Sequence, residues 1–183
     1  DVIVNDDYAV SAANYVTPSF GTPVNTLIGD LHIFHVQGDG AASPYAEQEV
    51  TVEGVVVADF QTNDELKGFF MQDATGDGDP QTSDGIFVYT QSAVDEGDWV
   101  EVTGTVVEYH NLTEISSVSN VSVISSGNTI SATQVTLPET VDGEIEQYEG
   151  MLVTIPHTMT VAQNYFQGRY GQVTLSTGGR MYQ

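Results

Sequence analysis

The sequence predicts an all-β protein built around a small five-stranded barrel. Runs of alternating Val, Ile, Thr and Tyr are separated by Gly, Asn and Asp, and helical periodicity is hard to find anywhere in the chain. The connections between the central runs are short, which favours a meander that closes on itself. The five predicted strands cover residues 49–60, 67–73, 85–90, 98–110 and 112–125.

The first and fourth of these runs match each other at an offset of 50 residues. In both, alternating valines lead into a glycine, Gly54 or Gly104, and continue beyond it. A glycine inside a strand weakens the strand unless the strand must bend, bulge or meet another backbone closely. Two long strands bent at a central glycine are what a tightly coiled barrel requires. A plain β-sandwich is the alternative.

The segments that flank the central strands are less regular. Leu31 to Val36 predicts one more strand, and the polar stretch after Ser125 predicts a linker with a short helical segment near residues 144–148. Residues 151–161 and 170–179 predict further strands, either packed on the barrel or part of a truncated second β-domain. We therefore expect an N-terminal arm or tail of a preceding domain at 1–30, the barrel at 31–125, a linker at 126–150 and extra strands at 151–183.

The charge balance is extreme. Twenty-six acidic residues oppose three basic ones, for a formal net charge of −23. Such a surface repels polyanions and anionic membranes unless cations intervene, and it suits secretion into salty or calcium-rich water. The chain has no cysteine, which favours a bacterial source. No stretch approaches the ~20 apolar residues of a membrane span, so no membrane partner is expected.

Four aspartates are crowded into the loop between the second and third strands. Counted from Asp73, oxygen-bearing residues fall at positions 1, 3, 5, 7 and 12, with a glycine at position 6. This approximates the spacing of a calcium-binding loop, although position 12 is Asp rather than Glu and the flanks are strands. The alternative is a solvated hairpin loop that uses Asp and Gly for their turn propensity. The candidate calcium ligands are Asp73, Thr75, Asp77, Asp79 and Asp84.

Several long runs resemble one region of large secreted bacterial nucleases, the region ahead of their catalytic domain. The runs read VTVEGVVVADF, GFFMQDATGDGDPQTSDGIFVYT, GDWVEVTGTVVEYHNLTEI, YEGMLVTIPHTMTV and GRYGQVTLSTGGRMYQ. The resemblance covers about residues 36–183. It implies an OB-fold, a five-stranded barrel, followed by a metal-dependent endonuclease/exonuclease/phosphatase domain beyond Gln183. Mg²⁺ or Mn²⁺ is then expected only in that catalytic domain, which would be the partner of this region.

Nucleic-acid contact is expected to be weak or cation-dependent. OB barrels commonly bind single strands through aromatic side chains and a basic groove, and here the basic half is missing. The candidate contacts are Trp99, Tyr109, Arg169 and Arg180. For the two arginines, an ion pair with an acidic neighbour at a domain contact is the favoured interpretation, and contact with a phosphate is the alternative.

Other polar residues carry no predicted role. His32 and His35 are three residues apart in a presumed strand, so their side chains are expected on opposite faces. Glu114, after an Asn-Leu-Thr turn, is expected to be an exposed acid. No nucleophile–base pair or closed metal set is recognisable, so no catalytic residue is predicted.

The sequence therefore favours a non-catalytic accessory region of a secreted bacterial nuclease. It would position the catalytic domain and assist cation-mediated contact with DNA or RNA. The alternative is a calcium-dependent extracellular module that binds a carbohydrate or a partner protein. A hydrolytic activity in this region itself is the third hypothesis.

Overall fold

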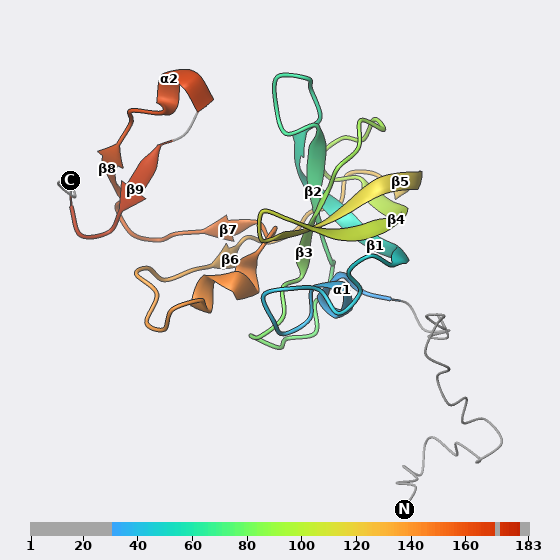
Figure 1. The fold of residues 1–183 in the computed structure, drawn as a ribbon, viewed down its shortest axis with the longest axis horizontal. Helices are drawn as coiled ribbons and strands as arrows, with labels where there is room; N and C mark the ends of the chain where they lie inside the picture. The colour runs from blue at the N-terminus through green and yellow to red at the C-terminus, as the bar shows by residue number, and fades with distance from the viewer. Residues whose placement is uncertain (1–30, 171–172, 180–183) are drawn as a thin grey trace, which may run out of the picture.

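A computed structural model of the protein describes residues 31–170 and 173–179; the predicted arm at 1–30 lies outside this part of the chain. The structure is mostly β, with little helix. Five strands pair in the order β1-β2-β3-β5-β4, and pairing between β1 and β4 closes them into a barrel (Figure 1). All five predicted strands are confirmed: β1 (Glu49–Phe60), β2 (Gly68–Gln72), β3 (Gly85–Val88), β4 (Trp99–Tyr109) and β5 (Leu112–Ser125).

The strand order differs from the predicted meander. β1, β2 and β3 follow one another antiparallel, but β4 pairs with β1, and β5 then lies between β4 and β3. β5 is consequently parallel to β3, with Phe87 opposite Glu114 and Val88 opposite Ile115. The meander prediction was wrong because a short connection does not decide which edge of the sheet the next strand joins. β4 joins the edge of β1 and not the edge of β3. Here β5, the longest strand, pairs with β4 along most of its length.

Both glycines predicted to permit close approach do so. A Cβ on Gly104 would lie 2.6 Å from Cγ2 of Ile115 and 2.8 Å from the carbonyl oxygen of Ser116, where the β4–β5 ladder shifts register. A Cβ on Gly54 would lie 3.0 Å from Cδ1 of Ile33. The two long strands therefore use glycine to let neighbouring elements come close inside a small barrel.

The barrel interior is filled by alternate residues of the strands. In β4, for example, Val100, Val102 and Val106 are fully buried while their neighbours are partly exposed. The other large side chains that the strands bury completely are Phe69, Met71, Ile86, Ile115, Val52, Val56 and Val88. Burial of this apolar area is the main term that holds the barrel together.

Residues predicted as a sixth strand form a short helix instead. α1 (Ile33–Gln37) lies against β1 and β3 at one end of the barrel (Figure 1). Ile33 and Val36 are both fully buried and belong to the core cluster. Apolar residues three apart share one face of a helix but opposite faces of a strand, so a single-sided packing surface selects the helix. The strand prediction for Leu31–Val36 was therefore wrong.

The C-terminal end of the predicted linker is hydrogen-bonded to the barrel. The Ser83 hydroxyl donates to the carbonyl oxygen of Glu149 at 2.6 Å, and the Leu152 N–H donates to Oε1 of Gln72 at 3.0 Å. The predicted helical segment is confirmed as a short 3-10 helix. The elements of this part are β6 (Thr133–Gln134), η2 (Glu144–Tyr148) and β7 (Val153–Thr154), with β6 and β7 paired in parallel.

The last described residues form a separate hairpin. β8 (Thr160–Gln163) and β9 (Thr174–Ser176) pair antiparallel, with α2 (Gln167–Tyr170) between them in sequence. Figure 1 shows this hairpin standing away from the barrel. Extra strands are therefore present after residue 150, in two-stranded pairs outside the barrel sheet. Within the described ranges, no helix is long and apolar enough to cross a membrane.

Candidate functional site

The strongest candidate site is a groove of about 580 Å³ on the outer surface of β2, β3 and β5. The loop between β1 and β2 bounds it on one side, and the turn between β4 and β5 bounds it on the other. We call it the aromatic groove. Its lining residues are Glu65, Leu66, Lys67, Phe70, Phe87, Tyr89, Tyr109, Leu112 and Glu114.

Three residues in one cross-strand row form the floor of the aromatic groove. Phe70 of β2 pairs with Phe87 of β3, and Phe87 in turn pairs with Glu114 of β5. The two phenyl ring centroids are 4.8 Å apart. Gly68 makes this arrangement possible, because a Cβ there would lie 2.5 Å from Cζ of Phe87. The alternation of β2 sends Phe69 into the core and Phe70 onto this face, since successive side chains of a strand point to opposite sides.

The walls of the groove carry exposed aromatic side chains. Tyr109 is 60% exposed and Tyr89 is 47% exposed. The turn that follows Tyr109 runs through His110 and Asn111, both with positive φ (53° and 65°), a tight reversal that holds Tyr109 opposite Leu112. Aromatic rings left open to solvent beside an apolar floor offer flat surfaces on which a base or a sugar ring can stack.

Charge in the groove is sparse and mostly negative. Lys67 is the one basic residue among the lining side chains. Glu65 is engaged locally, because its Oε2 accepts hydrogen bonds from the N–H (3.2 Å) and the hydroxyl (2.8 Å) of Thr62. A phosphate in the groove can therefore contact one basic side chain at most. A ligand with hydrogen-bond donors can instead contact the acidic group on the floor.

Glu114 is buried at this floor and has no hydrogen-bond partner among the described residues. Its side chain is only 7% exposed, so the expectation of an exposed acid was wrong. The cause is the strand register, which sets Glu114 beside the ring of Phe87 rather than at the rim. Burial raises the pKa of the Glu114 carboxyl. Two nearby glutamates, unlike Glu114, receive hydrogen bonds from the protein. Glu108 accepts from the N–H of Ser43 (2.7 Å), and Glu149 accepts from the N–H of Thr113 (2.9 Å).

The aspartate loop joins β2 to β3 as predicted. The Asp73 N–H donates to the carbonyl oxygen of Asp84 at 2.8 Å and closes the loop. Within it, Oδ1 of Asp77 accepts from the N–H of Asp79 (2.8 Å), and Oδ1 of Asp73 accepts from the N–H of Thr75 (3.2 Å). These contacts are turn-forming hydrogen bonds of the kind that Asp makes with its own backbone.

Asp84 is the unusual member of this loop. Its Oδ1 is buried without a hydrogen-bond partner in the described part of the chain, and its carboxylate lies against Gly76. Burial raises the pKa of Asp84, and the carboxylates of Asp77 and Asp73 raise it further. In residues 31–170 and 173–179, no three acidic or His side chains converge as a ready-made metal site.

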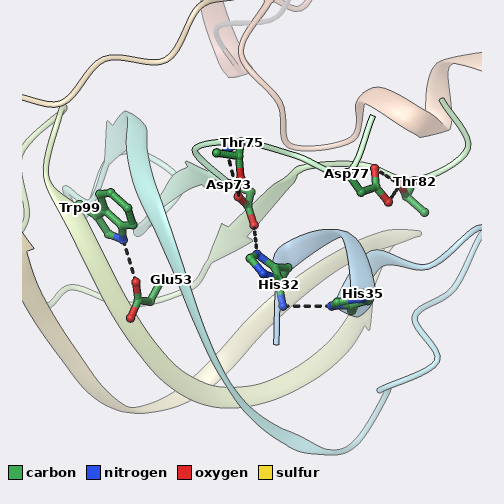
Figure 2. A network of polar contacts seen from close by, with 8 residues as sticks. All are labelled: His32, His35, Glu53, Asp73, Thr75, Asp77, Thr82 and Trp99. Atoms are coloured by element: carbon green, nitrogen blue, oxygen red, sulfur yellow. Dashed lines mark hydrogen bonds and ion pairs between the residues drawn. The ribbon is translucent and has the colours of Figure 1, made fainter. Parts of the chain in front are cut away.

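The Asp73 carboxylate also contacts His32, the residue that precedes α1. Its Oδ2 lies 2.7 Å from Nδ1 of His32, and the Asp73 side chain is only 7% exposed (Figure 2). His32 and His35 are on one side of the helix rather than on opposite faces of a strand, and the His32 N–H donates to Nδ1 of His35 at 3.2 Å. Asp73, a predicted metal ligand, therefore also links the aspartate loop to the start of the helix through its contact with His32.

The predicted nucleic-acid contacts do not share one surface. Tyr109 lines the aromatic groove, whereas Trp99 lines a different pocket together with Glu53, to whose Oε2 its indole N–H donates at 3.0 Å (Figure 2). Arg169 belongs to α2, and Arg180 lies outside the described residues.

Sequence reasoning missed most of the groove. Phe70, Phe87, Lys67 and Glu114 were not predicted as site residues. One signal was present, a lone glutamate inside the otherwise neutral run of β5. No protein-family model matches the chain, and no curated protein matches it.

Proposed function

We propose that the chain is a non-catalytic OB-fold region of a secreted bacterial nuclease, and that its aromatic groove holds single-stranded nucleic acid near a catalytic domain of the same polypeptide. The strand order β1-β2-β3-β5-β4 with closure between β1 and β4 supports the OB-fold assignment. The bacterial, extracellular setting follows from the resemblance of the sequence, the absence of cysteine and the net charge of −23.

The observation that carries the proposal is the position of the aromatic groove. OB-folds bind oligonucleotides and oligosaccharides on the face of strands 2 and 3, between the loop joining strands 1 and 2 and the loop joining strands 4 and 5. The groove occupies this face, with Phe70 and Phe87 on its floor and Tyr109 on its wall. Stacking of bases on such rings contributes about 1–3 kcal/mol per base.

Contact with a strand must rely on stacking and on added cations. With Lys67 as the one cation in the groove, release of counterions from phosphates contributes little to affinity. The surrounding acidic surface repels the backbone, and divalent cations or salt reduce that repulsion. We therefore propose that binding strengthens, rather than weakens, when Ca²⁺ or Mg²⁺ is added.

Fluorescence anisotropy with 5′-fluorescein single-stranded DNA and RNA tests this function. The full 183-residue chain is titrated at 20, 100 and 300 mM NaCl, with and without 5 mM Ca²⁺. Saturable binding that survives salt and is lost in Phe70→Ala supports the proposal. Absence of binding in every condition, or cleavage of the strand by the isolated chain, contradicts it.

We also propose a Ca²⁺ site in the aspartate loop as a stabilising feature of the extracellular form. The buried Oδ1 of Asp84 lacks a partner and faces additional repulsion from Asp77, so a bound cation would relieve both penalties. A calcium-dependent carbohydrate or protein module is the second candidate function, because an acidic groove with exposed tyrosines also suits neutral sugars. Binding of a neutral oligosaccharide without binding of any strand would favour it.

A further inference from the structure

The most unusual group in the aromatic groove is the carboxylate of Glu114. The side chain is more than nine-tenths buried, lines the groove, and receives no hydrogen bond from the described residues. A buried carboxylate without donors is costly, so a protein normally supplies them. The neighbouring Glu108 and Glu149 have protein donors, whereas Glu114 has none. The Glu114 oxygens are not sealed from solvent, so water in the groove supplies their donors, and a ligand that displaces this water must supply donors in its place.

The surroundings of Glu114 restrict which donors can reach it. Phe87 is its cross-strand neighbour, and Phe70 lies directly beyond. Phe87 is only 4% exposed, so a ligand must place a flat ring against the partly exposed Phe70 and point hydrogen-bond donors from the edge of that ring toward Glu114. A nucleobase stacked on the aromatic floor has this form.

The four bases differ in what they offer an ionised carboxylate, which only accepts hydrogen bonds. Guanine presents N1–H and the N2 amino group side by side, a pair of donors that matches two carboxylate oxygens. Adenine and cytosine place a ring-nitrogen acceptor beside their amino group, and that acceptor is repelled. Thymine and uracil offer one N–H between two carbonyl oxygens. Guanine alone satisfies both oxygens of Glu114.

We propose that Glu114 is a specificity-determining residue that selects guanine from single strands held in the aromatic groove. This inference rests on the proposed function of the groove. The selectivity comes from the base edge rather than from phosphates, because the groove offers one lysine, Lys67. A paired donor set that meets its acceptor discriminates a base by about tenfold.

The test is a set of single-base substitutions in a short strand. Fluorescein-labelled dT₆ carrying one central guanine, inosine, adenine or cytosine is titrated with the full chain in 100 mM NaCl and 5 mM Mg²⁺. Inosine keeps N1–H but lacks the amino group, so the expected order of affinity is guanine, then inosine, then adenine and cytosine, over about tenfold. This comparison uses the unmodified protein and does not depend on the folding of any variant.

Two variants assign the preference to one carboxylate. Glu114→Gln keeps the shape and replaces one oxygen by a donor, so the guanine preference is expected to vanish and affinity for adenine to rise. Glu49→Gln removes the same charge from an exposed position of β1 outside the groove, and it should keep the guanine preference. Circular dichroism and the melting temperature show that both variants are folded.

The outcomes separate the inference from the function on which it rests. Strand binding with no base preference, or with a preference that Glu114→Gln leaves intact, overturns guanine selection while the proposed function stands. Equal loss of preference in Glu49→Gln and Glu114→Gln also overturns it, because the effect would then be one of overall charge. No binding to any strand overturns both.

Discussion

Replacing Glu114 by glutamine is expected to stabilise the protein. The Glu114 side chain is buried beside Phe87 and receives no hydrogen bond from the described residues, but its oxygens still reach water in the groove. Only part of the cost of about 1–3 kcal/mol for an unpaired buried polar group therefore applies. Glutamine has nearly the same shape and is neutral, but its amide is also unpaired, so only part of that cost is recovered. We expect the free energy of unfolding at pH 7.5 to rise by roughly 0.5–1 kcal/mol.

The assay is thermal unfolding followed by circular dichroism, with urea unfolding as a second measurement. A gain of this size raises the melting temperature by roughly 1–4 °C for a protein of this length. Glu108→Gln is the matched control, because the Glu108 carboxylate accepts from the Ser43 N–H and from the Thr113 hydroxyl at 2.9 Å. Weakening two charge-assisted hydrogen bonds at a more exposed position should lower the free energy of unfolding by roughly 0.5–1 kcal/mol.

The two substitutions therefore have opposite expected signs although both replace Glu by Gln on adjacent strands. If Glu114→Gln is as destabilising as Glu108→Gln, the Glu114 carboxylate is satisfied within the folded protein, and the reason for assigning it to a ligand disappears. A gain in stability together with a loss of guanine preference is the signature of a residue that serves binding at the expense of stability.

Four further outcomes are expected. Tyr109→Ala should weaken strand binding about fivefold or more while changing the melting temperature by less than about 1 °C, because the ring is exposed. Gly104→Ala should destabilise by more than ~2 kcal/mol in urea unfolding, whereas Gly178→Ala, with open space around it, should be near neutral. Burial raises the pKa of the Glu149 carboxyl above its value in the unfolded chain. Its contribution to the free energy of unfolding is therefore fully present below the unfolded-state pKa and is lost as the pH rises through the folded-state pKa. The melting temperature should accordingly be higher near pH 5 than at pH 7.5, by a margin that shrinks in Glu149→Gln. Finally, millimolar Ca²⁺ should raise the melting temperature of the wild type, and Asp84→Asn should reduce that shift; no calorimetric heat with EDTA-stripped protein would contradict the site.

The strands were predictable and their order was not, for a physical reason. A strand can be recognised from the alternation of apolar and polar residues in its own sequence. Residues such as Val100, Val102 and Val106 therefore identify β4 without information from other segments. The position of β5 between β3 and β4 depends on pairing between segments far apart in the chain. Ile33 and Val36 show a second limit, because a five-residue helix is too short to display a period.

The same distinction explains what could be foreseen of the site. The aspartate loop is contiguous, so its composition and spacing were visible in the sequence. The aromatic groove is assembled from residues of β2, β3, β4 and β5 and of the loop between β1 and β2, and the neighbours Phe70, Phe87 and Glu114 meet only through cross-strand register. Glu114 was taken for a surface acid because its burial comes from those neighbours and not from its own run.

Affinity for a nucleic acid has two sources, contacts with phosphates and contacts with bases. A net charge of −23 largely removes the first source, and the aromatic groove can supply the second. Each phosphate neutralised by a basic residue adds a counterion-release term of slope about −0.7 on a single strand, and Lys67 can supply about one such contact. Base stacking and base-edge hydrogen bonds have little dependence on salt. The module that we propose would hold strands weakly and by their bases, and it would release them readily at the low salt where repulsion is strongest. Placed beside a catalytic domain, it would contribute base selection without trapping the polyanion that the enzyme must cut and release.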